Sequence, residues 1–322
     1  MSEKINQVEP NISEQDIQRV SDYMSSGAWI TEHALTKELE EKIAHFVCRK
    51  YAIAVPNGTI AIYLSLLAAG LTEGKRVAVP NITMIATINA ILWAGAEPVI
   101  IDLNERLCMS LKSLQTVDKL DGVIYVPLNG RTEDGLAIEE YCKERNITLI
   151  EDSAHALGSQ YQDRMCGSLG SMSVFSFTPH KIITMGQGGL VLTDDDSLYE
   201  YLLDLKTFNR SKDKSDWHDG FGLNFKITDL QSALGLSQFE KINEFINIKK
   251  EMFQFFERSI KKYNFIDFFE YETPWFVDLI CESEKERDSA KAFLGDANIL
   301  TRESYPALSK QSFLQNVETV SY

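Results

Sequence analysis

The chain has 322 residues, more than one typical hydrophobic core needs, so we expect one large and one smaller domain. Hydrophobic residues make up 44% and charged residues 25%, the proportions of an ordinary globular protein. With 32 Lys and Arg against 47 Asp and Glu, the formal net charge is −15. This charge argues against a general nucleic-acid or anionic-membrane surface, because phosphates would be repelled at long range.

The five cysteines are widely spaced, form no CxxC pair and do not cluster with the five histidines. We therefore expect free thiols and a reducing compartment, and we expect no metal site. The N-terminus lacks the apolar core of a signal peptide, and the longest apolar run, residues 61–71, is too short to span a bilayer. These features favour a cytoplasmic protein with neither nucleic-acid nor membrane partners.

Short apolar runs alternate with helical patterns over the first two hundred residues. The runs predict strands at 51–55, 76–79, 98–102, 122–126, 147–151, 173–177 and 189–192. Helical patterns lie among them at 59–69, 86–93 and 138–143. The alternation predicts an α/β fold with a mostly parallel sheet and helices on both faces, and ligands bind such sheets at the carboxyl ends of the strands.

The pattern changes after residue 228. A long helical pattern covers 229–256, interrupted near Asn243, and is followed by a predicted strand at 265–271 and a predicted helix at 284–294. We place the domain boundary near residue 240. Residues 1–240 would form the large domain and residues 241–322 a smaller α+β domain.

Lys181 lies where an apolar run enters a turn rich in glycine, at 186–189. Such surroundings can lower the pKa of an amine, and a neutral amine can form a Schiff base with a carbonyl. A lysine that extends from a strand end to the surface is the alternative. Pro179 and the glycines favour a shaped turn over that alternative.

Asp152 and His155 follow the predicted strand at 147–151. A lysine for the Schiff base and an aspartate for the pyridinium nitrogen are the protein's two main contacts with pyridoxal phosphate (PLP). His155 could bind the phenolic oxygen of that cofactor. The alternatives are a helix-capping aspartate and a packed loop histidine, and local sequence leaves both open.

Two further segments are candidate binding elements. Gly58 and Thr59 follow a predicted strand and open a helix, where free amides suit a phosphate, although the same residues also make an ordinary turn. Ser176 could add a phosphate contact. The loop that carries Trp217 and His218 is either a binding loop or a structured connection.

Three ordered motifs, at 151–158, 175–189 and 222–231, resemble the DegT/DnrJ/EryC1/StrS family of sugar aminotransferases. The resemblance runs from about residue 26 to about residue 308. It implies a type I PLP-dependent aminotransferase fold and a homodimer with active sites shared at the subunit interface.

The resemblance also implies roles for individual residues. Lys181 would carry PLP and shuttle protons, Asp152 would bind the pyridine nitrogen, and His155 would approach the phenolic oxygen. The other implied positions are phosphate contacts from Gly58, Thr59 and Ser176, a phosphate contact across the dimer from Asn224, a cofactor-ring contact from Met84, and substrate contacts from Trp29 and His218.

Residues 80–87 and 217–224 resemble the perosamine-synthase type within this family. That type implies transfer of an amino group from glutamate, which leaves as 2-oxoglutarate, to C4 of a nucleotide-linked 4-keto-6-deoxyhexose, with pyridoxamine phosphate between the two half-reactions. The product would be a 4-amino-4,6-dideoxy sugar of the viosamine or perosamine type. The nucleotide (GDP, UDP or dTDP) and the sugar configuration stay open.

Several positions depart from the family pattern. Met84 replaces an aromatic residue common in relatives, Gln187 replaces a glutamate, and Pro127 and Asn129 replace a histidine and a tyrosine. The chain also ends at Tyr322, before the last segment of most relatives, so the small domain is either truncated or a short variant.

Three alternatives to C4 amination remain. One is amination at C3. Another is a related sugar 3-dehydratase, which carries histidine where this chain has Lys181. The third is a regulatory protein that binds the cofactor or the sugar without turnover.

Overall fold

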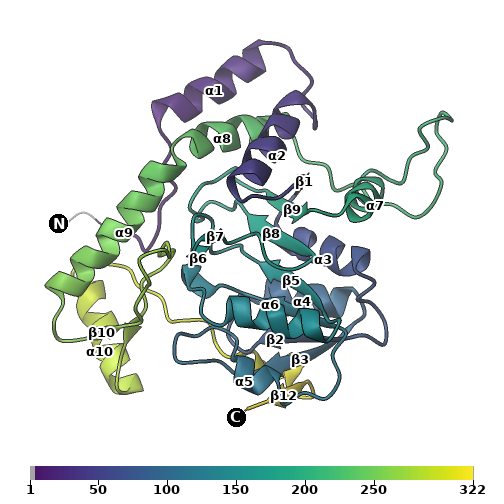
Figure 1. Ribbon diagram of the computed structural model, residues 1–322. Helices are drawn as coiled ribbons and strands as arrows, with labels where there is room; N and C mark the ends of the chain where they lie inside the picture. Colours follow the sequence, from purple (N-terminus) through teal and green to yellow (C-terminus); the bar gives the residue numbers. More distant parts are fainter. Residues whose placement is uncertain (1–3, 322) are drawn as a thin grey trace.

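The computed structural model describes residues 4–321 and is built around an eight-stranded sheet (Figure 1). The strand order is β1-β9-β8-β5-β4-β2-β3-β12. The bounds are β1 (Tyr51–Val55), β2 (Arg76–Pro80), β3 (Glu97–Ile101), β4 (Gly122–Tyr125), β5 (Thr148–Asp152), β8 (Met172–Ser176), β9 (Gly189–Thr193) and β12 (Glu318–Val320).

Most neighbouring strands run parallel, and β9 runs antiparallel to both β8 and β1. In the register, Asp152 at the end of β5 pairs with Val174 of β8, and Ser176 at the end of β8 pairs with Gly189. Gly189 also pairs with Val55 at the end of β1. One edge of the sheet therefore collects the ends of β1, β5 and β8.

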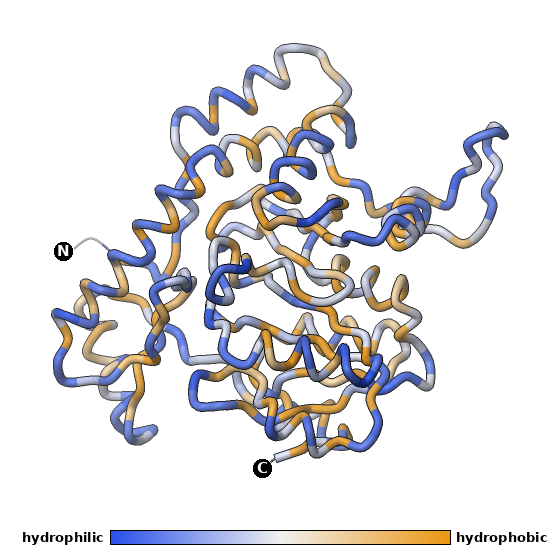
Figure 2. Tube along the Cα trace, viewed as in Figure 1, coloured by the Kyte–Doolittle hydropathy of each residue, from blue (hydrophilic) through white to orange (hydrophobic). Residues whose placement is uncertain are grey.

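Helices cover both faces of this sheet, as predicted. Ile53, Val77 and Ile150 point to one face, where they pack with residues of α3 (Gly58–Ala68), α4 (Ala86–Trp93) and α7 (Asp196–Lys206). The intervening strand residues pack on the other face with α2 (Ala34–Phe46), α6 (Gly135–Glu144) and α8 (Asp229–Glu240). In Figure 2 much of the trace in the centre of the body, where the strands lie, is orange, as expected for strands buried on both faces.

After β9 and α7 the chain continues with two successive helices, α8 and α9 (Ile242–Ser259), with a break at Lys241 close to the predicted interruption. The remaining elements are α1 (Glu14–Ser25), the short α5 (Leu111–Leu114), the two-stranded pairs β6 (Gln160–Tyr161) with β7 (Arg164–Met165) and β10 (Asn264–Phe265) with β11 (Leu279–Ile280), α10 (Glu284–Asp296), and 3-10 turns at Leu128–Gly130, Leu308–Lys310 and Ser312–Leu314. The domain boundary near residue 240 stays a prediction.

The last described strand, β12, lies parallel to β3 on the large sheet.

The predicted strand at 265–271 is wrong beyond residue 265. The backbone N–H of Phe269 donates to the carboxylate of Glu272 at 2.7 Å, and the N–H of Glu272 donates to the carbonyl of Phe269 at 2.9 Å. The apolar residues after 265 therefore belong to a turn. The backbone N–H of Phe269 is bonded to the Glu272 side chain and not to a neighbouring strand.

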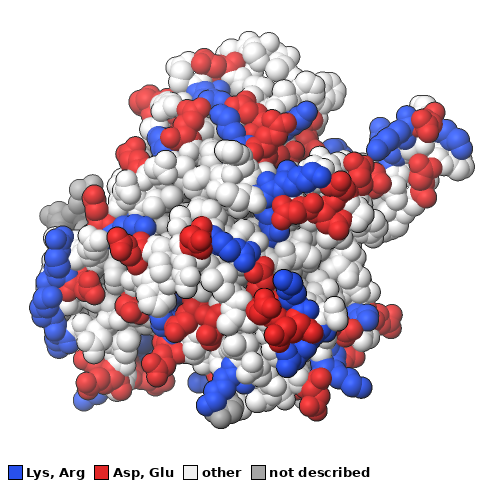
Figure 3. Space-filling view, viewed as in Figure 1, with Lys and Arg blue, Asp and Glu red and all other residues white. Residues whose placement is uncertain are grey.

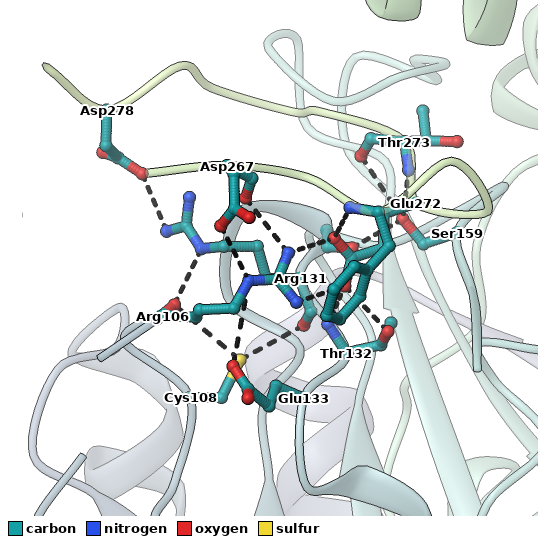
Figure 4. A network of polar contacts seen from close by, with 12 residues as sticks. Arg106, Cys108, Arg131, Thr132, Glu133, Ser159, Asp267, Glu272, Thr273 and Asp278 are labelled. Carbon is teal, nitrogen blue, oxygen red and sulfur yellow. Dashed lines mark hydrogen bonds and ion pairs between the residues drawn. The ribbon is translucent and has the colours of Figure 1, made fainter. Parts of the chain in front are cut away.

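Glu272 fastens this turn to the large sheet through a buried ion pair (Figure 4). Arg106 donates from both terminal nitrogens, at 2.5 Å and 3.2 Å, and Thr132 donates from its N–H and its hydroxyl, at 2.7 Å and 2.8 Å. We call Arg106, Thr132 and Glu272 the Glu272 clamp. Its paired charges and satisfied oxygens fix residues 267–278 against the large sheet.

The surface carries mixed charge. On the face drawn in Figure 3, acidic and basic side chains alternate over the large sheet, and no single-sign region dominates that view. Within residues 4–321, we find no helix with the length and apolar character needed to cross a membrane.

Replacing Glu272 by Ala should destabilise the protein strongly. The change leaves the buried guanidinium of Arg106 without its main partner, and breaking a buried ion pair costs about 3–5 kcal/mol. Denaturant unfolding followed by tryptophan fluorescence measures the loss. Glu303→Ala is the matched control, because Glu303 forms its ion pairs with Arg287 and Lys291 at the surface. Equal midpoints for the two variants would contradict the role assigned to the clamp.

Candidate active site

Lys181 lies in the turn that follows β8, with its backbone N–H bonded to the carbonyl of Thr178 at 3.1 Å. Its Nζ stands 4.1 Å from the centre of the Trp275 ring, and the indole N–H donates to the carbonyl of His180 at 2.7 Å. Burial lowers the pKa of Lys181 to about 7, with Asp152 opposing and Arg302 adding to the shift. The amine can therefore gain or lose a proton near neutral pH.

Asp152 is the last residue of β5 and is buried. Its carboxylate accepts from the hydroxyl of Thr87 on α4 at 2.8 Å and from the N–H of Ala154 at 3.3 Å. Burial raises the pKa of Asp152, while the bonds from Thr87 and Ala154 and the charge of Lys181 lower it. Because no helix begins at this position, the helix-capping alternative is excluded.

His155 is buried against Trp275, with the two ring centres 3.9 Å apart. Burial, followed by the nearby charge of Lys181, lowers its pKa well below the ordinary value, so the imidazole is neutral. Its Nδ1 has no hydrogen-bond partner among the described residues. A buried polar atom of this kind is expected to have a partner, and a bound ligand could supply it.

Gly58 and Thr59 open α3 immediately after β1, with Asn57 as the N-cap residue. The Asn57 side chain accepts from the N–H of Ile60 at 3.0 Å. A Cβ on Gly58 would lie 2.9 Å from Cβ of Ser176, so only glycine lets β8 approach the start of the helix this closely. The result is a helix N-terminus beside a serine hydroxyl, an arrangement suited to a phosphate.

Lys181, Asp152 and His155 thus meet at the sheet edge where Gly58, Thr59 and Ser176 also lie. The structure shows no hydrogen bond or ring contact from the other predicted site residues, as far as they are described, to these three. Met84 is 43% exposed and Trp29 is 68% exposed. Among the described residues, neither of them makes a hydrogen bond or ring contact with Lys181, Asp152 or His155.

His218 and Asn224 lie on the arm, residues 207–227, whose middle part projects from the body beyond α7 (Figure 1). His218 Nδ1 pairs with the carbonyl of Phe208 at 2.8 Å, and Asn224 accepts from Lys226 at 2.6 Å. Their roles, like those of Met84 and Trp29, stay predictions.

Asn129, one of the departures from the family pattern, supports Trp275. Its backbone adopts a left-handed conformation with φ 55°, and its carbonyl accepts from the Trp275 N–H at 2.9 Å. Its side chain donates to Asp278 at 2.7 Å. The residue therefore helps to hold Trp275 against Lys181.

Sequence reasoning missed four residues around Lys181: Trp275, Thr87, Tyr305 and Arg302. The Tyr305 ring lies nearly parallel to His155, with centres 6.1 Å apart. The Arg302 guanidinium lies 4.8 Å from the Tyr305 ring. Thr87 lay inside a segment that the resemblance had singled out, and Tyr305 stood at the end of the matched stretch. Trp275 and Arg302 follow no motif or periodic pattern.

Comparison with known proteins identifies the family. The pattern of the DegT/DnrJ/EryC1/StrS aminotransferase family matches residues 10–321. A GDP-perosamine synthase of Escherichia coli O157:H7 is 34% identical over 91% of this chain and 82% of its own length. A GDP-perosamine synthase of Vibrio cholerae is 30% identical over 93% of this chain and 84% of its own length.

A solved structure confirms the expected fold. Spr1654 of Streptococcus pneumoniae, in its PLP form, superposes with a TM-score of 0.87 over 98% of this chain and 87% of its own, at 23% identity. At that identity the likeness speaks for the fold alone. With the family pattern covering nearly the whole chain, the protein belongs to the DegT/DnrJ/EryC1/StrS aminotransferase family.

Proposed function

We propose that the chain uses PLP to transfer an amino group from glutamate to C4 of a nucleotide-linked 4-keto-6-deoxyhexose. The observation that carries this proposal is the buried Lys181 amine, with a pKa of about 7, beside Asp152 and His155. The relatives named GDP-perosamine synthases favour this product class. We also propose a cytoplasmic location, on the basis of the five unpaired cysteines.

The residues at the sheet edge fit PLP. Asp152 offers a buried carboxylate that would bind the ring nitrogen, and the unpartnered Nδ1 of His155 would bind the phenolic oxygen. The start of α3 with Ser176 offers donors for the phosphate. When bound, PLP supplies an electron-withdrawing ring that stabilises negative charge on the substrate carbon.

Lys181 then performs the proton transfers. Its Nζ removes the proton from the α-carbon of the donor and, in the second half-reaction, delivers a proton to C4 of the sugar. A base works best with a pKa near the operating pH, and burial gives Lys181 that value. Asp152 would keep the ring nitrogen of bound PLP protonated, and Trp275 shields the amine from water on one side.

We further propose a homodimer that completes the site. Large apolar side chains stand exposed on the single chain, among them Trp29 at 68% and Phe221 at 72%. Their exposure supports a partner surface. In the dimer, Asn224 would reach the phosphate of the neighbouring subunit's cofactor, and Trp29, Met84 and His218 would line the cofactor and sugar pocket.

A panel of nucleotide-linked keto sugars tests the proposed function. With glutamate as donor, we expect 4-keto-6-deoxyhexoses to give 4-amino products, identified by mass and NMR. Amination of 3-keto sugars alone would refute the C4 assignment. Loss of the C3 oxygen from the product would point to a 3-dehydratase, and binding without conversion would point to a regulatory protein.

Lys181→Ala should abolish turnover. The change removes the proton-shuttling amine, whose general acid–base contribution alone is about 10²- to 10⁴-fold. Stopped-flow absorbance of the cofactor after addition of glutamate measures the rate. Lys250→Ala is the control, because Lys250 is a surface lysine bonded to the carbonyl of Glu270. A Lys181→Ala variant that kept the parent rate would refute the assignment.

The reactivity of Lys181 in the cofactor-free chain should titrate near pH 7. An acylating reagent attacks only the neutral amine, so the rate should rise through pH 7 and level off above it. Asp152→Asn should move the midpoint to lower pH, because the Asp152 charge raises the pKa of Lys181. Peptide mass spectrometry measures the modification site by site. A midpoint near that of surface lysines would contradict the burial argument.

A further inference from the structure

A buried lysine lies where the arm leaves the body. Lys206 is the last residue of α7, and none of its side chain is exposed. Its Nζ donates to the carbonyl of Ala54 on β1 at 2.8 Å, and it lies 2.8 Å from the carboxylate of Glu32 and 3.7 Å from that of Glu40. We call Lys206, Glu32 and Glu40 the Lys206 cluster. The proton transfers of Lys181 use none of these side chains.

Glu32 is the principal partner of Lys206 in this cluster. The carboxylate of Glu40 accepts from the backbone N–H of Ala54 at 2.6 Å, and burial raises its pKa to about 7 against the opposing charge of Lys206. Glu40 is therefore partly protonated at neutral pH. Glu32 lies nearer to Lys206, and within the described part of the chain its second oxygen is buried without a hydrogen-bond partner. The charge of Lys206 is thus the main compensation for burying the Glu32 carboxylate.

The backbone of this cluster holds both ends of the arm. The N–H of Phe225 donates to the carbonyl of Lys206 at 3.0 Å, and the N–H of Glu32 donates to the carbonyl of Ile227 at 3.1 Å. The two residues whose side chains form the buried ion pair are therefore the same two that bind the end of the arm through their backbones. Asn224 precedes Phe225, so it is held one residue from this attachment.

The side chain of Asn224 is suited to an anion. Asn224 is exposed in the single chain, and its amide oxygen accepts from Nζ of Lys226 at 2.6 Å. This bond leaves the amide nitrogen, with its two donors, as the end that an acceptor would meet. An amide donor beside a lysine suits a phosphate.

We propose that the Lys206–Glu32 ion pair positions Asn224 for the cofactor phosphate of the neighbouring subunit. The inference rests on the proposed function, which supplies the dimer and the phosphate contact of Asn224. Without the ion pair, the attachment of the arm would depend on backbone bonds that open more easily. Asn224 would then have to be ordered when the phosphate binds, and that ordering weakens binding.

The test compares Glu32→Gln with Glu40→Gln through the dissociation constant of PLP, measured by absorbance titration of the cofactor-free protein. Glu32→Gln keeps the size of the side chain and removes its charge, so the constant should rise about 10-fold. Lys206 keeps Ala54 and Glu40 as partners in this variant, so the chain should still fold. Glu40→Gln copies the protonated form of Glu40 and leaves the Lys206–Glu32 pair intact, so its constant should match that of the parent.

A double-mutant cycle separates positioning from a general loss of stability. Asn224→Ala should weaken PLP binding on its own. Adding Glu32→Gln to Asn224→Ala should cause little further loss, because the ion pair acts through Asn224.

Hydrogen–deuterium exchange of the cofactor-free chain gives a readout that needs no bound PLP. The peptide covering residues 222–228 should exchange faster in Glu32→Gln than in the parent. Glu200→Gln is the matched control on the arm, because Glu200 pairs with Lys212 at the surface, and its exchange should equal that of the parent.

Two outcomes would overturn the positioning role while the proposed function stands. One is an unchanged dissociation constant for PLP in Glu32→Gln. The other is a pair of independent losses from Glu32→Gln and Asn224→Ala that multiply in the double variant. An unchanged constant in Asn224→Ala would overturn both the inference and the proposed role of Asn224 in the dimer. Absence of PLP binding by the parent would overturn the proposed function itself.

Discussion

Burial of one amine is the constraint on which the rest of the site depends. Lys181 is useful near neutral pH only because burial lowers its pKa to about 7 against the opposing charge of Asp152. The sheet topology produces this balance. Parallel β5 and β8 end at the same edge, so a carboxylate and an amine from different strands share one buried space. Moving either strand end would change the pKa as well as the geometry.

The segment at 267–278 places Trp275 on one side of this space and is held by the Glu272 clamp. Burying a carboxylate and a guanidinium is costly, and the four hydrogen bonds to the Glu272 oxygens from Arg106 and Thr132 offset much of that cost. The clamp fixes the position of the turn, and the turn thereby fixes Trp275 against Lys181 and His155. Hydrophobic contacts alone are not directional and would hold Trp275 less firmly in one position.

The sequence predicted the large sheet and the central residues because both follow local rules. Apolar runs located every strand from β1 to β9 that lines the site, and strand-end logic brought Lys181, Asp152 and His155 together. The sequence did not predict the positions of Trp275, Tyr305 and Arg302. These residues come from irregular segments that have no periodicity and are placed by long-range contacts. The false strand at 265–271 has the same origin, since Glu272 takes a backbone donor that a neighbouring strand would have taken.

These two groups of residues divide the proposed reaction between them. The sheet edge holds the groups suited to the cofactor, and their positions follow from strand register. The later segment brings Trp275 against Lys181 and Tyr305 beside His155. Its position depends on the Glu272 clamp rather than on strand register. The exposed arm adds a third element, because a dimer would let one subunit's Asn224 complete the neighbour's site.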